Sequence, residues 1–371
     1  MKNIIEKRSN ALQILLWRGI FLFFYLSLWA NEPYYREQKY TEIKKINKEF
    51  QIGNSSSLFV SNKYGDITFL TDATLKDKIK IEVEIKATAN NLSDVQSRIK
   101  QISVDFNQKS SDVSARTIIR QNNSFFKGFG KKSTINLQIN YKISLPVKTQ
   151  ITAENKYGNI FLNKTERDLK IDAEYGSLQL GEIWANTELD LEYITKANIN
   201  IAKRVNLETS YSTISIEKAD RIDLKASYSN FKIESIKQVE ASISYGIFDI
   251  NETNFLNLNG DYTNIAIGKV SNQLSVENDY GTIVIKEILP TTKSVNVNSS
   301  YANVSINYHP DWSFDYHFST TFASLNVPKN LPFTEKNKRI MSSTLKGNKG
   351  KSDNVFRVES DYGGVTITER P

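Results

Sequence analysis

The chain has 371 residues, 39% of them hydrophobic, and a formal net charge of +7. It contains no cysteine, which excludes disulfide bonds and thiolate metal sites. The charge is uneven, because residues 329–353 alone hold seven basic and two acidic side chains. Once this segment and residues 1–30 are set aside, the remainder is close to neutral, and nothing in it indicates nucleic-acid binding.

Residues 1–30 have the pattern of an export signal. Lys2, Lys7 and Arg8 precede an apolar segment that ends at Ala30, a small residue suited to the position before a cleavage site. We therefore expect this segment to be a signal peptide and the protein to be exported, to the periplasm or the cell surface. The alternative is an uncleaved anchor, and only then would the protein contact the membrane.

Residues 31–150 are predicted to form an α+β lead-in that caps the fold. Residues 58–70 contain the first copy of a sequence motif that later repeats. The strict alternation of apolar and polar residues over 78–87 predicts a strand with one buried side. A helical stripe follows, made by Leu92, Val95, Ile99 and Ile102, with Asn91 or Ser93 as its N-cap. We expect this helix to cover an end or a side of the sheet, and we expect further strands at 104–106, 113–120 and 134–145.

From residue 151 onward one aromatic position keeps returning at a nearly constant spacing. With two outlying copies, at Tyr64 and Tyr362, there are twelve. The complete set is Tyr64, Tyr157, Tyr175, Tyr193, Tyr211, Tyr228, Tyr245, Tyr262, Tyr280, Tyr301, Phe322 and Tyr362. In eleven of the twelve, the residues three and five places after the aromatic are apolar, and in most copies those four and six places before it are apolar too.

Two short strands in each repeat of about 17–18 residues predict an all-β fold. We interpret it as a single-domain β-solenoid, parallel β-helix-like, that spans residues 151–371 behind the strand-helix-strand lead-in. The aromatic residue shares its parity with the apolar residues before it, so the rings are predicted to form a column inside the core. Packing is favoured over the other use of such a column, which is glycan binding by face contact.

Two segments interrupt this regularity and carry the candidate contact residues. One is a Gly-rich loop with aromatic and basic side chains, and the other is the basic segment 329–353, predicted as a loop excursion before a last coil at 354–368. The candidates are Phe125, Phe126, Lys127, Phe129, Lys131, Lys132, Lys338, Arg339, Lys346, Lys349 and Lys351. Such side chains suit anionic polymers, although a solvated loop without a partner explains them more simply.

No catalytic, cofactor-binding or metal-binding residue is predicted. The only histidines, His309 and His317, are spaced unlike a metal signature, and residues of the opposite parity there form the expected buried side, namely Trp312, Phe314, Tyr316 and Phe318. Acidic residues are scattered at outward positions, and no nucleophile, zinc or phosphate-loop motif is present. We therefore expect a protein that is not an enzyme.

Three stretches resemble the exported bacterial "putative adhesin" family. They are the strand-helix-strand block 78–120, the segment from Tyr141 to Ile160, and the Gly-containing segment 347–367. The resemblance implies a β-solenoid fold and an exported location, and it brings no catalytic residue. This chain departs from the family in having Tyr or Ser-Tyr where many members have Ser-Gly.

The sequence thus predicts a rigid binding or structural surface at the bacterial cell envelope, in the manner of an adhesin. Two alternatives remain. One is a periplasmic scaffold or sensing partner of another envelope protein, and the other is a carbohydrate-active enzyme on a β-helix. The expected partners are a surface glycan or another envelope protein, and not nucleic acid.

Overall fold

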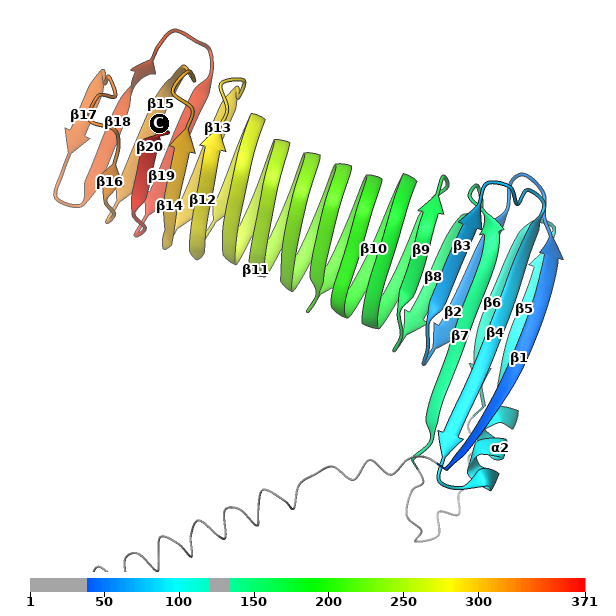
Figure 1. Ribbon diagram of the computed structural model, residues 1–371. Helices are drawn as coiled ribbons and strands as arrows, with labels where there is room; N and C mark the ends of the chain where they lie inside the picture. The colour runs from blue at the N-terminus through cyan, green and yellow to red at the C-terminus, as the bar shows by residue number, and fades with distance from the viewer. Residues whose placement is uncertain (1–38, 121–133, 371) are drawn as a thin grey trace, which may run out of the picture.

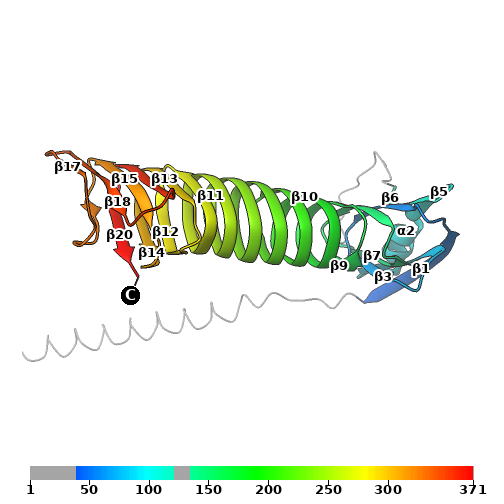
Figure 2. The same ribbon diagram turned by 90° about the horizontal axis from the view of Figure 1, so that it is seen from above.

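The computed structural model describes residues 39–120 and 134–370, and in this part of the chain it is almost entirely β-structure (Figure 1). All twenty strands belong to one connected sheet, and one short helix accompanies them. Figures 1 and 2 show a long, narrow body in which the chain passes back and forth across the long axis. The predicted all-β class is confirmed.

The N-terminal end is an antiparallel sheet that carries the helix. Its strands and helix are β1 (Tyr40–Gln51), β4 (Lys78–Ala89), β7 (Asn136–Pro146), β5 (Ile102–Lys109), β6 (Asp112–Ile119) and α2 (Leu92–Lys100). Strand β4 pairs with both β1 and β7, and β5 pairs with β6, all antiparallel. Asn91 is the N-cap of α2, as predicted, and accepts a hydrogen bond from the Ser93 amide at 3.0 Å. Val95 and Ile99 are buried beside β1 and β4, whereas Leu92 is exposed.

The middle of the body consists of parallel strands whose register equals the sequence period. Its strands are β2 (Ser57–Lys63), β3 (Ile67–Asp72), β8 (Gln150–Lys156), β9 (Ile160–Thr165), β10 (Leu169–Ser210), β11 (Thr213–Asn278), β12 (Gly281–Ile288), β13 (Ser294–Ser300) and β14 (Ala302–Tyr308). Ile151 pairs with Leu169, Val205 with Ile222, and Leu274 with Val295, so each residue pairs with its own equivalent in the next repeat. Each repeat therefore lies directly beside the next, and the same sequence position recurs along the axis about every 4.8 Å.

The C-terminal end departs from the predicted order. Its strands are β15 (Phe314–Thr321), β16 (Leu325–Asn326), β17 (Glu335–Lys338), β18 (Ser342–Lys349), β19 (Val355–Asp361) and β20 (Val365–Glu369). Strand β19 pairs with β13 on one side and β15 on the other, and β20 lies likewise between β14 and β16. The copy at 354–368 was expected to be the last coil. That was wrong, because it is inserted between two earlier copies.

The basic segment was predicted as a loop, and this is also wrong for residues 335–349. Strands β17 and β18 form an antiparallel hairpin, and β18 pairs with β15, which would otherwise be the end of the sheet. All four residues of β17 are exposed, and two of them are lysines. Lysine on an edge strand opposes further strand pairing, so the hairpin closes this end.

One continuous apolar core runs through the whole body and includes most of the inward-facing Ile, Val and Leu residues. Toward the C-terminal end it becomes aromatic, and Trp312, Phe314, Tyr316 and Phe318 are all buried, as predicted. The indole of Trp312 donates a hydrogen bond to the Thr292 carbonyl at 2.7 Å, so its polar group is satisfied within the core.

A buried phenol in the N-terminal sheet should make stability sensitive to alkaline pH. Tyr141 is 1% exposed and shares a 2.7 Å hydrogen bond with the Thr117 hydroxyl, and burial raises its pKa to about 12. The unfolded phenol ionises near its ordinary pKa of 10, so this contribution to stability is complete below pH 10 and is lost as the pH rises toward 12. Over that range Tyr141 alone should cost about 2 kcal/mol.

We expect Tyr141→Phe to lower the free energy of unfolding by about 1 kcal/mol at pH 8, because the phenol bond to Thr117 is lost while Thr117 still donates to Asn62. Between pH 10 and pH 12, however, the variant should lose less stability than the wild type. Urea unfolding followed by circular dichroism at pH 8, 10 and 11.5 measures both effects. Parallel pH profiles for the two proteins would contradict the assignment.

Candidate binding ridge

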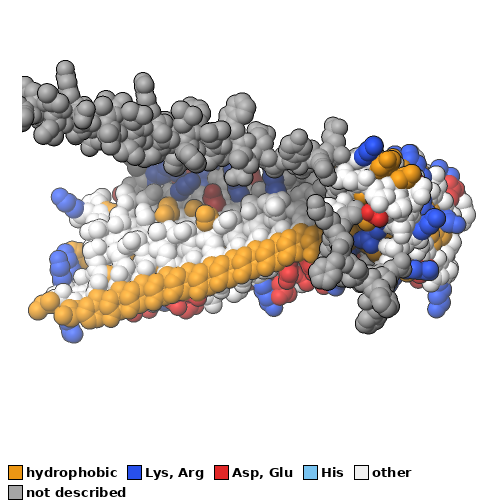
Figure 3. All heavy atoms as spheres, turned by 90° about the horizontal axis from the view of Figure 1, so that it is seen from below, with side chains coloured by type: hydrophobic (Ala, Val, Ile, Leu, Met, Phe, Trp, Pro, Cys, Tyr) orange, Lys and Arg blue, Asp and Glu red, His pale blue; other side chains and the backbone are white. Residues whose placement is uncertain are grey.

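The twelve recurring aromatic residues form one uninterrupted stack along the body, which we call the aromatic ridge. Neighbouring ring centroids lie 4.4 to 5.4 Å apart, and the ring planes differ by 1° to 11°. Tyr64 stacks on Tyr157 at the start of the ridge, and Tyr362 lies between Tyr301 and Phe322 at its end. Figure 3 shows the ridge as a straight hydrophobic stripe on the surface.

The ridge lies on the outside, so the prediction that its rings fill the core is wrong. Eleven of the twelve residues are 38% to 52% exposed, and Tyr64 is intermediate. The prediction assumed that residues of the same parity point to the same side, and this holds only while the chain is extended. Eleven of the twelve residues adopt the left-handed conformation, with φ between 50° and 67°, and so form the turn itself. At the twelfth, Tyr280, it is the following Gly281 that has the positive φ, of 118°.

The left-handed turn is an unfavourable place for tyrosine. A non-glycine residue pays about 1–2 kcal/mol there, and Gly or Asn adopts this conformation more readily. Stacking stabilises each aromatic pair by about 0.5–1.5 kcal/mol, which roughly offsets the strain without exceeding it. Folding alone therefore gives little reason for an aromatic residue at all twelve turns.

The geometry of the ridge exposes ring edges and not ring faces. At centroid separations near 4.8 Å, parallel rings cover each other's faces, and only the two terminal rings have a neighbour on a single side. None of the ridge hydroxyls forms a hydrogen bond with any residue in 39–120 or 134–370. The ridge therefore presents apolar ring edges and free phenol groups, an arrangement that does not suit a sugar stacked on a ring face.

The two sides of the ridge differ in chemistry. On the strands that lead into the turn, outward positions carry carboxylates in several repeats, while Lys63, Lys156 and serines such as Ser227 occupy the equivalent positions in others. The carboxylates are Glu154, Asp172, Glu174, Glu192, Asp261, Asp279 and Asp361. On the strands that leave it, the outward position two residues after the ring is neutral and polar in most repeats, as at Asn159, Thr213, Asn230, Asn264, Thr282 and Asn303. We call these the acidic shoulder and the amide shoulder. Figure 3 shows acidic side chains along part of one flank of the stripe.

Crowding on the acidic shoulder changes its titration. Partial desolvation, and then the carboxylates of Asp190 and Glu154 in the adjacent repeats, raise the pKa of Asp172. Desolvation, the stacked phenols on either side and the carboxylate of Glu174 raise the pKa of Tyr175. In both groups desolvation is the larger cause, and parallel stacking adds to it by bringing like groups together along the axis.

Of the contact residues predicted from the sequence, the structure describes only those of the basic segment. Phe125, Phe126, Lys127, Phe129, Lys131 and Lys132 fall outside the described residues. In the C-terminal hairpin, Lys346 pairs with Glu335 at 3.0 Å and Lys349 with Glu369 at 3.2 Å. Lys338, Arg339 and Lys351 have no ion-pair partner within the described residues, and the first two line a cavity of about 620 Å³ beside Phe322.

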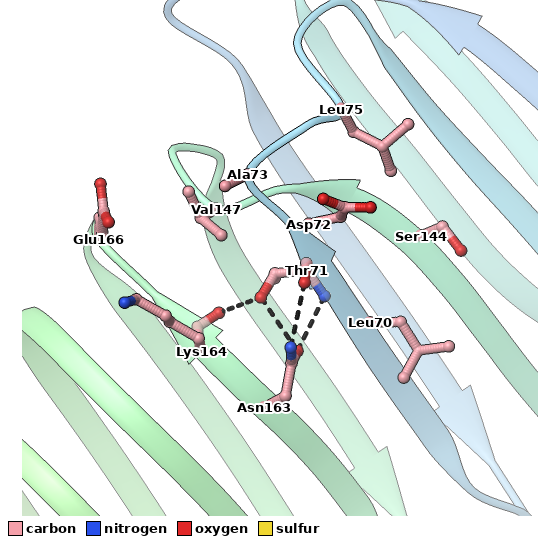
Figure 4. Close-up of a pocket in the computed structure, with 10 residues that line it drawn as sticks. All are labelled: Leu70, Thr71, Asp72, Ala73, Leu75, Ser144, Val147, Asn163, Lys164 and Glu166. Atoms are coloured by element: carbon pink, nitrogen blue, oxygen red, sulfur yellow. Dashed lines mark hydrogen bonds between the residues drawn. The ribbon is translucent and has the colours of Figure 1, made fainter.

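Another cavity, of about 480 Å³, lies where β3 and β9 end (Figure 4). Thr71 donates to the Lys164 carbonyl at 2.6 Å, and Asn163 donates to the Thr71 carbonyl at 3.0 Å, so these polar groups hold the two strands together. Hydrogen bonds from Thr74 lower the pKa of the Asp72 carboxyl at the same rim. These contacts explain the polar lining as structural.

Within the described residues no group of His, Cys, Asp or Glu is arranged to hold a metal ion. His309 lies 3.7 Å from Asp311, the residue whose amide it binds, so this histidine has a local role in the turn after β14. No helix in the described part of the chain has the length and hydropathy needed to span a membrane.

Comparison with known proteins gives matches among solved structures alone. No family model and no curated protein matches the chain. A "putative cell adhesion protein" from Clostridium sporogenes is 12% identical, and the match covers 89% of this chain and all of the other, with a TM-score of 0.18. A "putative adhesin" from Parabacteroides merdae is 9% identical over 88% of this chain and 97% of the other, with a TM-score of 0.30.

A "putative lipid binding protein" from Parabacteroides distasonis is 11% identical over the same shares of both chains, with a TM-score of 0.27. The resemblance to adhesin-like proteins found in the sequence is therefore confirmed. Identities of 9–12% and TM-scores of 0.30 or less carry no function from those proteins to this one.

Substitution at a central ridge position should separate backbone strain from ring stacking. Tyr228 has φ 50° and stacks on Tyr211 and Tyr245. Tyr228→Asn loses two stacking contacts but relieves the strain, so we expect a loss of at most about 1 kcal/mol. Tyr228→Val loses the same contacts and places a β-branched residue in the left-handed turn, so it should lose about 2 kcal/mol more. Chemical denaturation of the two variants checks this, and equal losses would contradict the turn assignment.

Proposed function

We propose that the chain is a β-solenoid rod that acts as a rigid, non-enzymatic binding surface at the bacterial cell envelope, with the aromatic ridge as its contact surface. The observation that carries this proposal is the ridge, twelve stacked rings on the surface, eleven of them at strained turns. Export by the N-terminal segment is part of the proposal.

The pairing of the repeats supports the solenoid that we propose. Every repeat contributes one strand before the turn and one after it, each pairs in parallel with its counterpart in the next repeat, and one apolar core lies between them. A unit of this kind cannot bury its apolar face alone, so the stack folds as one body and resists bending. Such a rod keeps all twelve rings in one line.

The size of the ridge supports a contact role. An aromatic side chain offers about 150–250 Å², so twelve half-exposed rings present roughly 1,000 Å² of mostly apolar surface. The largest apolar patch on a typical monomeric protein is about 300–600 Å², and larger ones mark interaction sites. Isolated exposed residues elsewhere, such as Trp184 and Phe255, are ordinary by comparison.

Two observations favour a binding surface over the carbohydrate-active enzyme. Glycoside hydrolysis needs two carboxyl groups facing each other across a cleft. Here many carboxylates on the strands are paired with lysine in the neighbouring repeat, as in Glu182–Lys164 at 3.2 Å and Glu188–Lys170 at 2.6 Å. The other acidic groups near the ridge are spread along its flank, at outward positions of the strands.

We expect the triple variant Tyr211→Asn, Tyr228→Asn and Tyr245→Asn to lose at least tenfold in binding to intact cells that express the protein. A matched control removes three exposed apolar side chains outside the ridge, by Phe161→Ser, Trp184→Ser and Phe255→Ser. Cell binding of the labelled proteins gives the affinities, and circular dichroism confirms folding. Equal binding by wild type and ridge variant would refute the contact role.

Exposure on the cell surface can be tested separately. Protease treatment of intact cells should degrade a surface protein, whereas a periplasmic scaffold would be cut only after the outer barrier is opened. A reducing-sugar assay on envelope polysaccharide should give the same signal with native and heat-inactivated protein. Sugar release by the native protein alone would favour the enzyme.

A further inference from the structure

We propose that the partner of the aromatic ridge is a second copy of this chain, and that two rods pair side by side and parallel, ridge against ridge. This inference rests on the proposed function, since it names the occupant of the same surface. Three features support it: the spacing of the rings, the area they offer and the difference between the two shoulders.

The spacing of the ridge is matched by another ridge of the same protein. The rings recur at 4.4 to 5.4 Å over eleven consecutive intervals, a length of roughly 50 Å set by the strand spacing of the sheet. A ligand that contacts every ring needs the same repeat along its whole length. A second copy has this repeat by construction, so contacts made at one repeat recur at all of them.

The area is sufficient for a stable dimer. A standard protein–protein interface buries about 800 Å² on each partner. The ridge alone offers roughly 1,000 Å² of mostly apolar surface, and the shoulders add to it. Because the exposed edges are apolar and the rings are already ordered by stacking, pairing immobilises few additional side chains.

The shoulders favour a parallel arrangement. In a parallel pair related by a two-fold axis along the rods, the acidic shoulder of each copy faces the amide shoulder of the other. Carboxylates such as Asp261 and Asp279 then face Asn264 and Thr282 of the same repeat in the other copy and can accept hydrogen bonds from them, and the free phenols of both ridges can donate to the same carboxylates. An antiparallel pair would place acidic shoulder against acidic shoulder, with like charges opposed.

The ends of the rod do not compete with this contact. At one end the exposed lysine-bearing strand β17 opposes edge pairing, and at the other the antiparallel sheet of β1, β4 and β7 with α2 ends the parallel stack. Among the described residues, the ridge therefore holds half of the exposed large hydrophobic side chains, gathered in one line.

The absence of cysteine makes a direct test available. Ser227 and Asn230 are exposed on the two shoulders beside Tyr228, and Lys203 is exposed about half a repeat away from the ridge. We expect Ser227→Cys protein mixed with Asn230→Cys protein to form a crosslinked heterodimer with a short bismaleimide. Lys203→Cys protein should remain monomeric under the same conditions. Crosslinking through Lys203→Cys alone would overturn the proposal, and self-crosslinking of Ser227→Cys alone would overturn the parallel arrangement.

Sedimentation equilibrium supplies the independent readout on the full chain. The wild type and the Phe161→Ser, Trp184→Ser, Phe255→Ser control should have twice the 42.4 kDa chain mass. In the Tyr211→Asn, Tyr228→Asn, Tyr245→Asn variant the dissociation constant should rise at least tenfold. A monomeric wild type at micromolar concentration overturns the proposal.

The cell-binding assay keeps the two proposals distinct. If the partner is a second copy, labelled protein should bind cells that express the chain and not cells that lack it. Ridge-dependent binding to both kinds of cell would leave the contact role intact and reject the second copy as its partner. In that case a glycan or another envelope component would be the occupant.

Discussion

Parallel in-register stacking is the constraint on which the rest of this structure depends. Because each repeat pairs with the next at an offset equal to the sequence period, whatever residue occupies a position is repeated along the axis about every 4.8 Å. The small effect of one residue in one repeat is thereby multiplied by the number of repeats. The same tyrosine that would be an ordinary exposed residue in one turn becomes a continuous apolar ridge in twelve.

The same multiplication acts on charge. Several rows alternate in sign between adjacent repeats and form ion pairs, such as Lys164–Glu182, Lys170–Glu188 and Lys269–Glu252. Exposed pairs of this kind contribute about 0–1 kcal/mol each, but they remove the repulsion that a row of like charges would bring. On the acidic shoulder this compensation is incomplete, although Lys156 pairs with Glu174. There, Asp172 lies between carboxylates of both neighbouring repeats, and its pKa is raised by desolvation and by that crowding. A row of like charges beside the ridge costs stability, which suggests that it has a use outside the fold of one chain.

The sequence was sufficient for the class of fold, the repeat and the strand pairing, because these follow from a period that is visible in the residues. The capped helix α2 and the aromatic C-terminal core were predicted for the same reason. The alternation of inward and outward side chains wrongly predicted that the ridge is buried. That alternation holds only along an extended strand, and Tyr157 and its equivalents stand where the strand ends. The frequent Gly or Ser after the ring, as in Gly158 and Ser212, was a local sign of that turn.

The order of the C-terminal strands in the sheet could not be predicted from the sequence. The insertion of β19 and β20 between earlier repeats changes no local pattern, because the copy at Tyr362 has the same residues wherever it is placed in the stack. The hairpin of β17 and β18 was missed because a polar, basic segment lacks the alternation of a half-buried strand.

A repeat protein with identical faces at both ends would continue to stack end to end. This chain closes both ends by different means, an antiparallel sheet with a helix at one and a hairpin with an exposed lysine-bearing edge at the other. The strand edges that drive end-to-end growth are thus covered or charged, while the long side of the rod retains an apolar stripe with free hydroxyl groups. Protection of the ends and exposure of the ridge both favour the sideways contact that we propose. A rod that meets its partners sideways gains area in proportion to its length, and that gives the number of repeats a function beyond folding.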